Sequence, residues 1–149
     1  MDIYLFVYLI LVAAPIGTVI HELGHVLGAT LVRADMTTLT IGTGRIIGRF
    51  VFKKTVYTIR LFYFLGGMAG SRRKDPYLPG EQITIASGGP LMSLAAAGAC
   101  FCLYNVFSNK YLLVLLLFNL WVAGVNIIPF RYKEKKSDGY TICMAVRNK

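Results

Sequence analysis

Long apolar stretches dominate the pattern of hydrophobic and polar positions along this chain of 149 residues. Uncharged runs of 18, 28 and 20 residues occupy positions 3–20, 82–109 and 111–130. A helix needs about 20 apolar residues to cross the hydrocarbon core of a bilayer. The pattern therefore predicts an integral membrane protein of mainly α class. We expect its three transmembrane helices at about 3–32, 91–107 and 111–128.

Two of these helices contain residues that perturb helical geometry. In the first, Pro15 and Gly17 are the expected kink points. In the second apolar run, Gly88-Gly89-Pro90 lies inside the run, and proline begins a helix easily but disrupts a helix interior. We therefore expect a non-helical or re-entrant segment at 83–89, before the second span.

The region between the first and second helices has a different composition, rich in Thr, Ile, Val, Phe and Tyr. Glycines and the pair Lys53-Lys54 divide it into three segments typical of strands, at 37–41, 45–52 and 55–64. This predicts a small membrane-associated β-hairpin or sheet over 37–64, with a turn at the lysine pair. Gly66, Gly67 and Gly70 are expected to end it, and 71–80 to form a polar loop.

Basic residues are concentrated in two regions, and the formal net charge is +9. Nine of the 16 lie within 33–74 and six within 131–149. The positive-inside rule then predicts a multi-pass cell-membrane protein with its N-terminus outside and a cytoplasmic C-terminal segment at 131–149. The chain is expected to form one domain, 1–149, that contacts anionic lipid. Nucleic-acid binding is not expected, because no basic helix or aromatic-basic motif accompanies the charge.

Residues 21–25 form the pattern H-E-x-x-H at the cytoplasmic end of the first predicted helix. On a helix, His21 and His25 share a face and can converge on one Zn²⁺ ion. Glu22 can then act as the general base for water at the metal. These are the only two histidines in the sequence, and ionisable residues in an apolar span indicate a functional site.

A catalytic zinc site needs a third protein ligand. The cysteines Cys100, Cys102 and Cys143 are poorly placed, which leaves a carboxylate. The remaining candidates are Asp2, Asp35, Asp75, Glu81, Glu134 and Asp138. Position favours Asp138, since it follows the third span and precedes a glycine that permits close backbone approach. The alternative is that Asp138 caps a helix at 140–146.

Several motifs together resemble the site-2 proteases, which are membrane-embedded zinc metalloproteases. His21–His25 resembles the metal-binding motif of that family. Asn126-Ile127-Ile128-Pro129 followed by Asp138-Gly139 resembles its N-x-x-P and D-G elements, and Gly89-Pro90 resembles its glycine-proline element. The strand-rich region with Leu65-Gly66-Gly67 resembles its β-hairpin region. The chain is similar to a minimal core of three spans.

The resemblance implies roles for individual residues. It implies that His21, His25 and Asp138 bind one Zn²⁺ and that Glu22 is catalytic. It also implies that Asn126 and Pro129 contribute to substrate binding, and that an extended substrate pairs with a strand of the β region. Two departures are the long charged linker at 130–137, which leaves Glu134 as an alternative ligand, and Ser93, where the family often has asparagine.

The function expected from these features is intramembrane hydrolysis of peptide bonds near the cytoplasmic face. The partners would be membrane-embedded or membrane-associated peptide substrates and the lipid bilayer, as in regulated intramembrane proteolysis. One alternative is a catalytically inactive peptide-binding or immunity protein of the same fold. Another is a metal or proton transporter, although the second and third spans have few polar residues for that function.

Overall fold

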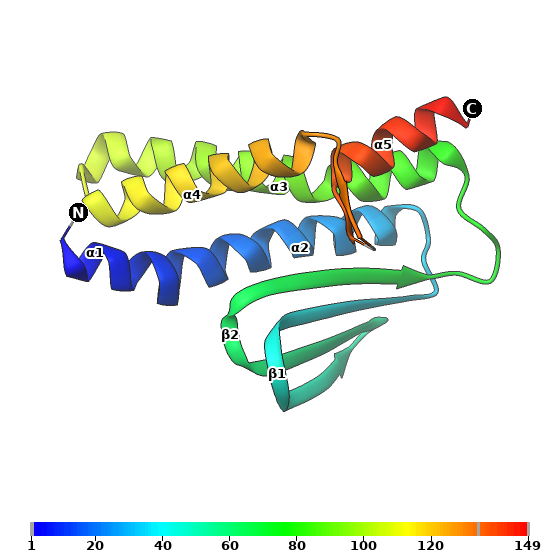
Figure 1. The fold of residues 1–149 in the computed structure, drawn as a ribbon, viewed down its shortest axis with the longest axis horizontal. Coiled ribbons are helices and arrows are strands. Elements are labelled where there is room, and N and C mark those ends of the chain that lie inside the picture. The colour runs from blue at the N-terminus through cyan, green and yellow to red at the C-terminus, as the bar shows by residue number, and fades with distance from the viewer. Residues whose placement is uncertain (1, 134, 149) are drawn as a thin grey trace.

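The computed structural model describes residues 2–133 and 135–148. Figure 1 shows long helices lying side by side, with a sheet against one of them. The helices are α1 (Ile3–Tyr8), η1 (Leu9–Ala13), α2 (Ala14–Leu31), α3 (Pro79–Phe107), α4 (Lys110–Ile127) and α5 (Asp138–Arg147). The strands are β1 (Met36–Phe52), β2 (Thr55–Arg72), β3 (Arg131–Tyr132) and β4 (Lys135–Lys136). In this part of the chain three helices, Ile3–Leu31, α3 and α4, are long and apolar enough to cross a membrane, as expected.

The first long helix runs through α1, η1 and α2, with a π-helical turn immediately before Pro15. Proline lacks the N–H that would bond to the carbonyl four residues earlier. That carbonyl belongs to Leu11, and it accepts a hydrogen bond from the hydroxyl of Tyr63 at 3.3 Å. The expected irregularity near Pro15 is therefore present, and a side chain from β2 donates a hydrogen bond to the helix backbone beside it.

The expectation of a non-helical or re-entrant segment at 83–89 was wrong. Helix α3 is continuous from Pro79 to Phe107, with Pro90 in its interior. The small residues that suggested a break instead form a contact surface between helices. A Cβ atom at Gly24 would overlap the carbonyl of Gly88, and one at Gly28 would lie 2.7 Å from the carbonyl oxygen of Thr84. Small residues let apolar helices approach backbone to backbone, so the packing of α2 on α3 favours a continuous helix here.

The sheet has two strands in sequence but four limbs in space, because both β1 and β2 bend. Residues 37–41 pair on one side with 55–59 and on the other with 67–71, while 55–59 also pairs with 48–52. Gly42, Gly44 and Gly66 have positive φ angles, which glycine adopts without steric cost. The three predicted strand segments thus belong to two bent strands.

The expected end of the β region near residue 64 was also wrong, since β2 continues to Arg72. Among the described residues, 67–71, here called the edge limb, pair with 37–41 along one side only. Gly67 lies close to α2, where an added Cβ would be 2.9 Å from Thr18 Cγ2 and 3.1 Å from Glu22 Cγ. The glycines therefore bring an open sheet edge to the histidine-bearing helix.

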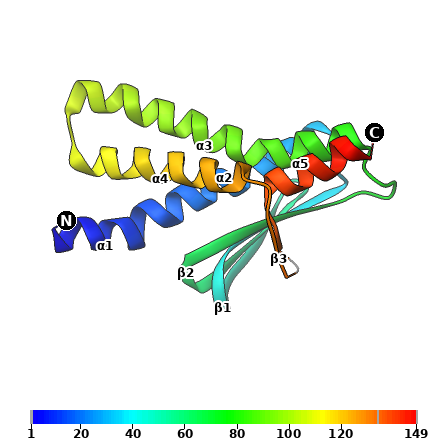
Figure 2. The ribbon, with the colours of Figure 1, turned by 45° about the horizontal axis from the view of Figure 1, so that its top comes forward.

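The C-terminal part returns the chain to the same end of the molecule. Helix α4 agrees closely with the third predicted span, and β3 and β4 then form a short antiparallel hairpin. In Figures 1 and 2 this hairpin projects from the end of α4 toward the side on which the sheet lies. Helix α5 follows directly. Its N-cap is Ser137, whose Oγ accepts a hydrogen bond from the N–H of Tyr140 at 3.1 Å.

Candidate metal centre

Helix α2 presents two imidazoles on the face that packs against α3. His21 and His25 are one helical turn apart, and their ring centroids are separated by 4.9 Å. His21 is 4% exposed, and the side chain of His25 is 14% exposed. Both rings are therefore largely buried, and the surrounding protein groups fix their positions.

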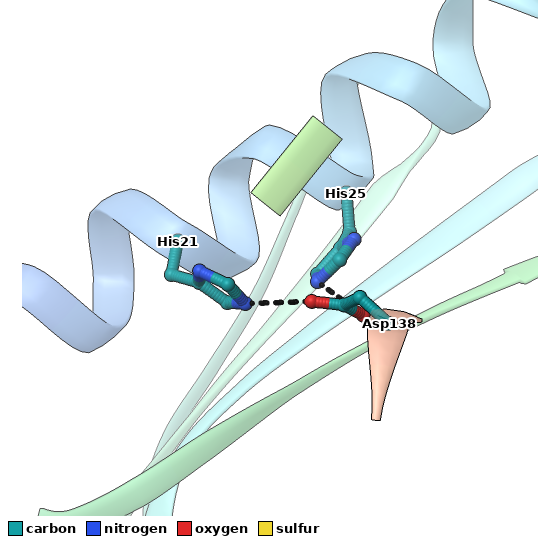
Figure 3. Close-up of side chains that lie close together, drawn as sticks. All are labelled: His21, His25 and Asp138. Carbon is teal, nitrogen blue, oxygen red and sulfur yellow. Dashed lines mark hydrogen bonds and ion pairs between the residues drawn. The ribbon is translucent and has the colours of Figure 1, made fainter. Parts of the chain in front are cut away.

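The carboxylate of Asp138 lies beside both imidazoles, as Figure 3 shows. Its Oδ2 is 3.1 Å from Nε2 of His21, and its Oδ1 is 3.3 Å from Nε2 of His25. The three groups come from α2 and from the first turn of α5, 117 residues away from His21 in the chain. Ser137 caps that helix, so the alternative role of Asp138 as the N-cap is wrong.

The other ring nitrogens have partners that orient the imidazoles. Nδ1 of His25 donates to the carbonyl oxygen of Ile85 at 2.9 Å, and Nδ1 of His21 is 3.0 Å from the hydroxyl of Ser93. With Nδ1 occupied, each Nε2 faces Asp138. A second hydrogen bond of this kind is what orients histidine ligands in metal sites.

The ionisation of Asp138 follows from the same contacts. Burial opposes its charged form, but hydrogen bonds and charge interactions with His21 and His25 outweigh burial and lower the pKa of the Asp138 carboxyl. The carboxylate is therefore negative at neutral pH. A carboxylate oxygen beside two imidazole nitrogens is a donor set suited to zinc.

The spacing of the donors fits a zinc ion. One ligand atom from each of His21, His25 and Asp138 lies within 4.8 Å of the other two. Two ligands bonded at about 2.0–2.1 Å in a tetrahedral site are roughly 3.3 Å apart, close to the observed nitrogen–oxygen distances. Gly89 lies directly against these atoms. A Cβ there would be 2.7 Å from Nε2 of His21 and 2.6 Å from Cε1 of His25, so only glycine leaves this space open.

A second glycine allows Asp138 to reach the site. A Cβ atom at Gly139 would overlap the carbonyl oxygen of Ile127 and lie 3.1 Å from the carbonyl carbon of Ile128. The first turn of α5 therefore packs against the end of α4 backbone to backbone. This explains in physical terms why aspartate and glycine are adjacent here, as expected for a glycine that permits close approach.

The histidines and Asp138 line a pocket of about 1000 Å³ between the helices and the sheet. Glu22 also lines it, and its Oε2 accepts a hydrogen bond of 2.6 Å from the N–H of Ala69 in the edge limb. The predicted base and the open sheet edge are thus in direct contact beside the three candidate ligands.

The remaining predicted site residues are distributed differently. Asn126 lines the pocket, and its amide donates to the carbonyl of Val122 in its own helix at 2.9 Å. Pro129 is exposed between α4 and β3 and lies outside the pocket lining. Their roles in substrate binding stay predictions. Glu134, the alternative third ligand, lies outside the described residues.

Sequence reasoning did not identify several residues around the pocket. Ser93 was noted only as a departure from the family, although it is four residues after Gly89 and so shares its helical face. The edge limb was not predicted as a strand, because its glycines were interpreted as the end of the β region. Lys135 and Lys136, which line the pocket, were treated only as linker charge.

The fold and the site define a class of protein: an apolar helical core with a histidine–histidine–aspartate donor set and an adjacent glutamate. The sequence model of peptidase family M50 matches residues 7–115, which is more than half of the chain. The chain therefore belongs to peptidase family M50, the site-2 protease family of metalloproteases, whose members are generally zinc-dependent. The resemblance described above is confirmed. No curated protein matches this chain significantly.

Proposed function

We propose that this protein is a zinc metalloprotease that hydrolyses peptide bonds of membrane-embedded or membrane-associated substrates near the cytoplasmic face. The single observation on which the proposal depends is that Asp138 meets His21 and His25 across 117 residues of sequence. Asp138 lies beyond the part of the chain that matches the family model. The geometry of the third ligand is therefore independent support.

Insertion in the membrane is part of the proposal. In the most apolar 18-residue stretch of each of the three long helices, only 17–22% of residues are buried within the protein. Large side chains such as Phe101 and Trp121, 58% and 61% exposed, would face lipid. The distribution of basic residues supports an external N-terminus and a cytoplasmic C-terminus. With that orientation the pocket would lie near the cytoplasmic boundary.

The residues of the chain would divide the chemistry among them. His21, His25 and Asp138 would hold zinc, which when bound supplies Lewis-acid polarisation and acidifies water. Glu22 would accept a proton from the attacking water at its carboxylate and deliver it to the nitrogen of the leaving amine. Asn126, in the pocket wall, is proposed to hold the substrate backbone, and Pro129 to shape the segment that leads to Asp138.

The edge limb would bind the substrate in an extended form. The backbone of Ala69 points away from residues 37–41 and toward the pocket, as its hydrogen bond to Glu22 requires. Backbone orientation alternates along a strand, so we expect Gly67 and Ser71 to face the same way. A substrate unwound from its helix needs partners for its backbone groups. Strand addition at this edge would provide them, and would compete with Glu22 for the N–H of Ala69 and so free the carboxylate.

Purified protein in liposomes would test the proposal, with a pool of synthetic single-span peptides as substrates and mass spectrometry of the products. Glu22→Gln should reduce cleavage by about 100- to 10,000-fold, the usual contribution of a general base, while zinc content stays at one per chain. Asp75→Asn, which neutralises an exposed carboxylate, is the matched control and should cleave normally.

A companion variant tests the ligand assignment. Asp138→Ala should lose bound zinc, measured by atomic emission after dialysis, because two imidazoles alone make an incomplete site. Full cleavage by the Glu22→Gln variant would contradict the proposed mechanism. A zinc-loaded wild type that binds the peptides and cleaves none would instead indicate a non-catalytic peptide-binding protein.

A further inference from the structure

The wall of the pocket nearest the strands contains three cationic side chains. Arg60 comes from β2, and Lys135 and Lys136 come from β4. Both lysines are exposed. The two carboxylates of the pocket, Glu22 and Asp138, are less exposed and are already hydrogen-bonded to Ala69 and to the imidazoles. The pocket therefore has its negative groups at the metal centre and its positive groups at the opening.

None of these three cations forms an ion pair with a carboxylate of the described residues. Within residues 2–133 and 135–148, the basic side chains that form ion pairs with carboxylates are Arg73 and Lys110, apart from the two histidines. Arg60 donates to the carbonyl oxygen of Gly44 at 2.8 Å, which orients its guanidinium without neutralising it.

The hairpin formed by β3 and β4, here called the basic hairpin, is firmly attached at its base. The hydroxyl of Ser137 donates to the carbonyl of Ile128 at 2.7 Å and accepts from the N–H of Phe130 at 3.0 Å. The N–H of Ser137 also donates to the carbonyl of Phe130 at 3.0 Å. Lys136 is two residues before Asp138, so the charge of the hairpin is held next to the candidate metal ligand.

We propose that the basic hairpin and Arg60 select substrates with acidic side chains within a few residues of the bond to be cleaved. This inference rests on the proposed function, because it assigns a substrate class to the same site. A peptide paired with the edge limb would occupy the pocket that Lys135 and Lys136 of β4 also line. Aspartate or glutamate near β4 would meet Lys135 and Lys136, whose opposite charge would favour acidic over neutral or basic peptides.

A lipid-binding role for these lysines is less consistent with their position. Basic residues that contact lipid headgroups lie on the outer surface of a membrane protein. Lys135 and Lys136 instead line the same pocket as His21, His25 and Asp138. The positions favour a peptide as the negatively charged partner.

Binding to the Glu22→Gln protein in phosphatidylcholine nanodiscs tests the proposal without turnover. The probes are three fluorescent single-span peptides that differ only in four juxtamembrane residues: Asp and Glu, Asn and Gln, or Lys and Arg. The acidic peptide should bind about 3- to 25-fold more tightly than the amide peptide, as expected for one or two exposed charge pairs. Lys135→Gln/Lys136→Gln should remove this preference.

The matched control is Arg131→Gln/Lys133→Gln, which removes the same charge from the same hairpin at positions outside the pocket lining. It should keep the preference for the acidic peptide. Equal affinity of the Glu22→Gln protein for all three peptides would overturn the proposal. So would an equal loss of the preference in both double variants.

Two further outcomes separate this inference from the protease proposal. If wild-type protein cleaves all three peptides at equal rates, the charge selection is wrong and the protease function stands. If wild-type protein cleaves none of them but binds the acidic peptide selectively through Lys135 and Lys136, the charge selection is supported and the protease function is contradicted.

Discussion

The two sides of the pocket are built on different principles. On the helical side, each imidazole has a partner for both ring nitrogens, and glycines allow α3 and α5 to approach the histidines closely. On the strand side, the edge limb has one unpaired side, and the two lysines of β4 are exposed. The helical side is closely packed and its imidazoles are fully hydrogen-bonded. The strand side is open and presents backbone groups and positive charge.

This difference corresponds to two separate requirements of peptide hydrolysis. Metal ligands must be held to within a fraction of an ångström, which requires buried groups with fixed hydrogen bonds. Recognition of an extended peptide uses backbone pairing, which tolerates many side chains. Glu22 connects the two sides, because it is on α2 and bonds to Ala69 of the edge limb.

The largest effect is expected from filling the space beside the imidazoles. In a Gly89→Ala variant the new methyl group would contact ring atoms of both His21 and His25 and displace them. We expect zinc affinity to fall by more than about 100-fold, measured by competition with a chelator. Gly98→Ala is the matched control in the same helix, because a Cβ there meets nothing within 4 Å. Unchanged zinc affinity in Gly89→Ala would show that this space does not belong to the metal centre.

An intermediate effect is expected on the strand side. Ala69→Pro removes the N–H that donates to Glu22 and that would pair with a substrate strand. Proline is tolerated on an edge strand. We expect kcat/KM for peptide cleavage to fall about 10- to 100-fold, because a backbone carbonyl of the bound substrate would be left without its partner, with zinc content unchanged. Ala69→Val keeps the N–H and should stay near wild type. Loss of zinc from Ala69→Pro would mean that the two sides are not independent.

The smallest effect is expected from removing the hydroxyl group that orients His21. Ser93→Ala leaves Nδ1 of a buried ring without its partner at 3.0 Å. Loss of such supporting bonds costs about 10- to 100-fold in metal affinity, and we expect the lower end because the other two ligands remain oriented. Ser87→Ala, whose hydroxyl bonds to Thr84 of its own helix, provides the comparison. An identical response of the two variants would remove Ser93 from the site.

Most elements near the site were predictable from local pattern, and the exceptions have a common cause. The length of the apolar runs predicted the helices, and the composition of 37–64 predicted strands. The continuous α3 and the edge limb were missed because glycine and proline were interpreted as breaks. In both places glycine instead permits close contact with α2, at Gly24 in one case and near Glu22 in the other. A single sequence does not distinguish these two uses of glycine.

The sequence by itself determined that His21 and His25 share one face of the first helix, because residues four apart on a helix lie on the same side whatever the rest of the chain does. It favoured Asp138 as the third ligand and left Glu134 as the alternative. Only the tertiary structure brought Asp138 to the imidazoles and Ser93 behind one of them, through close packing at Gly89 and Gly139. Contacts between distant residues depend on how helices pack, and packing is a property of the whole folded chain.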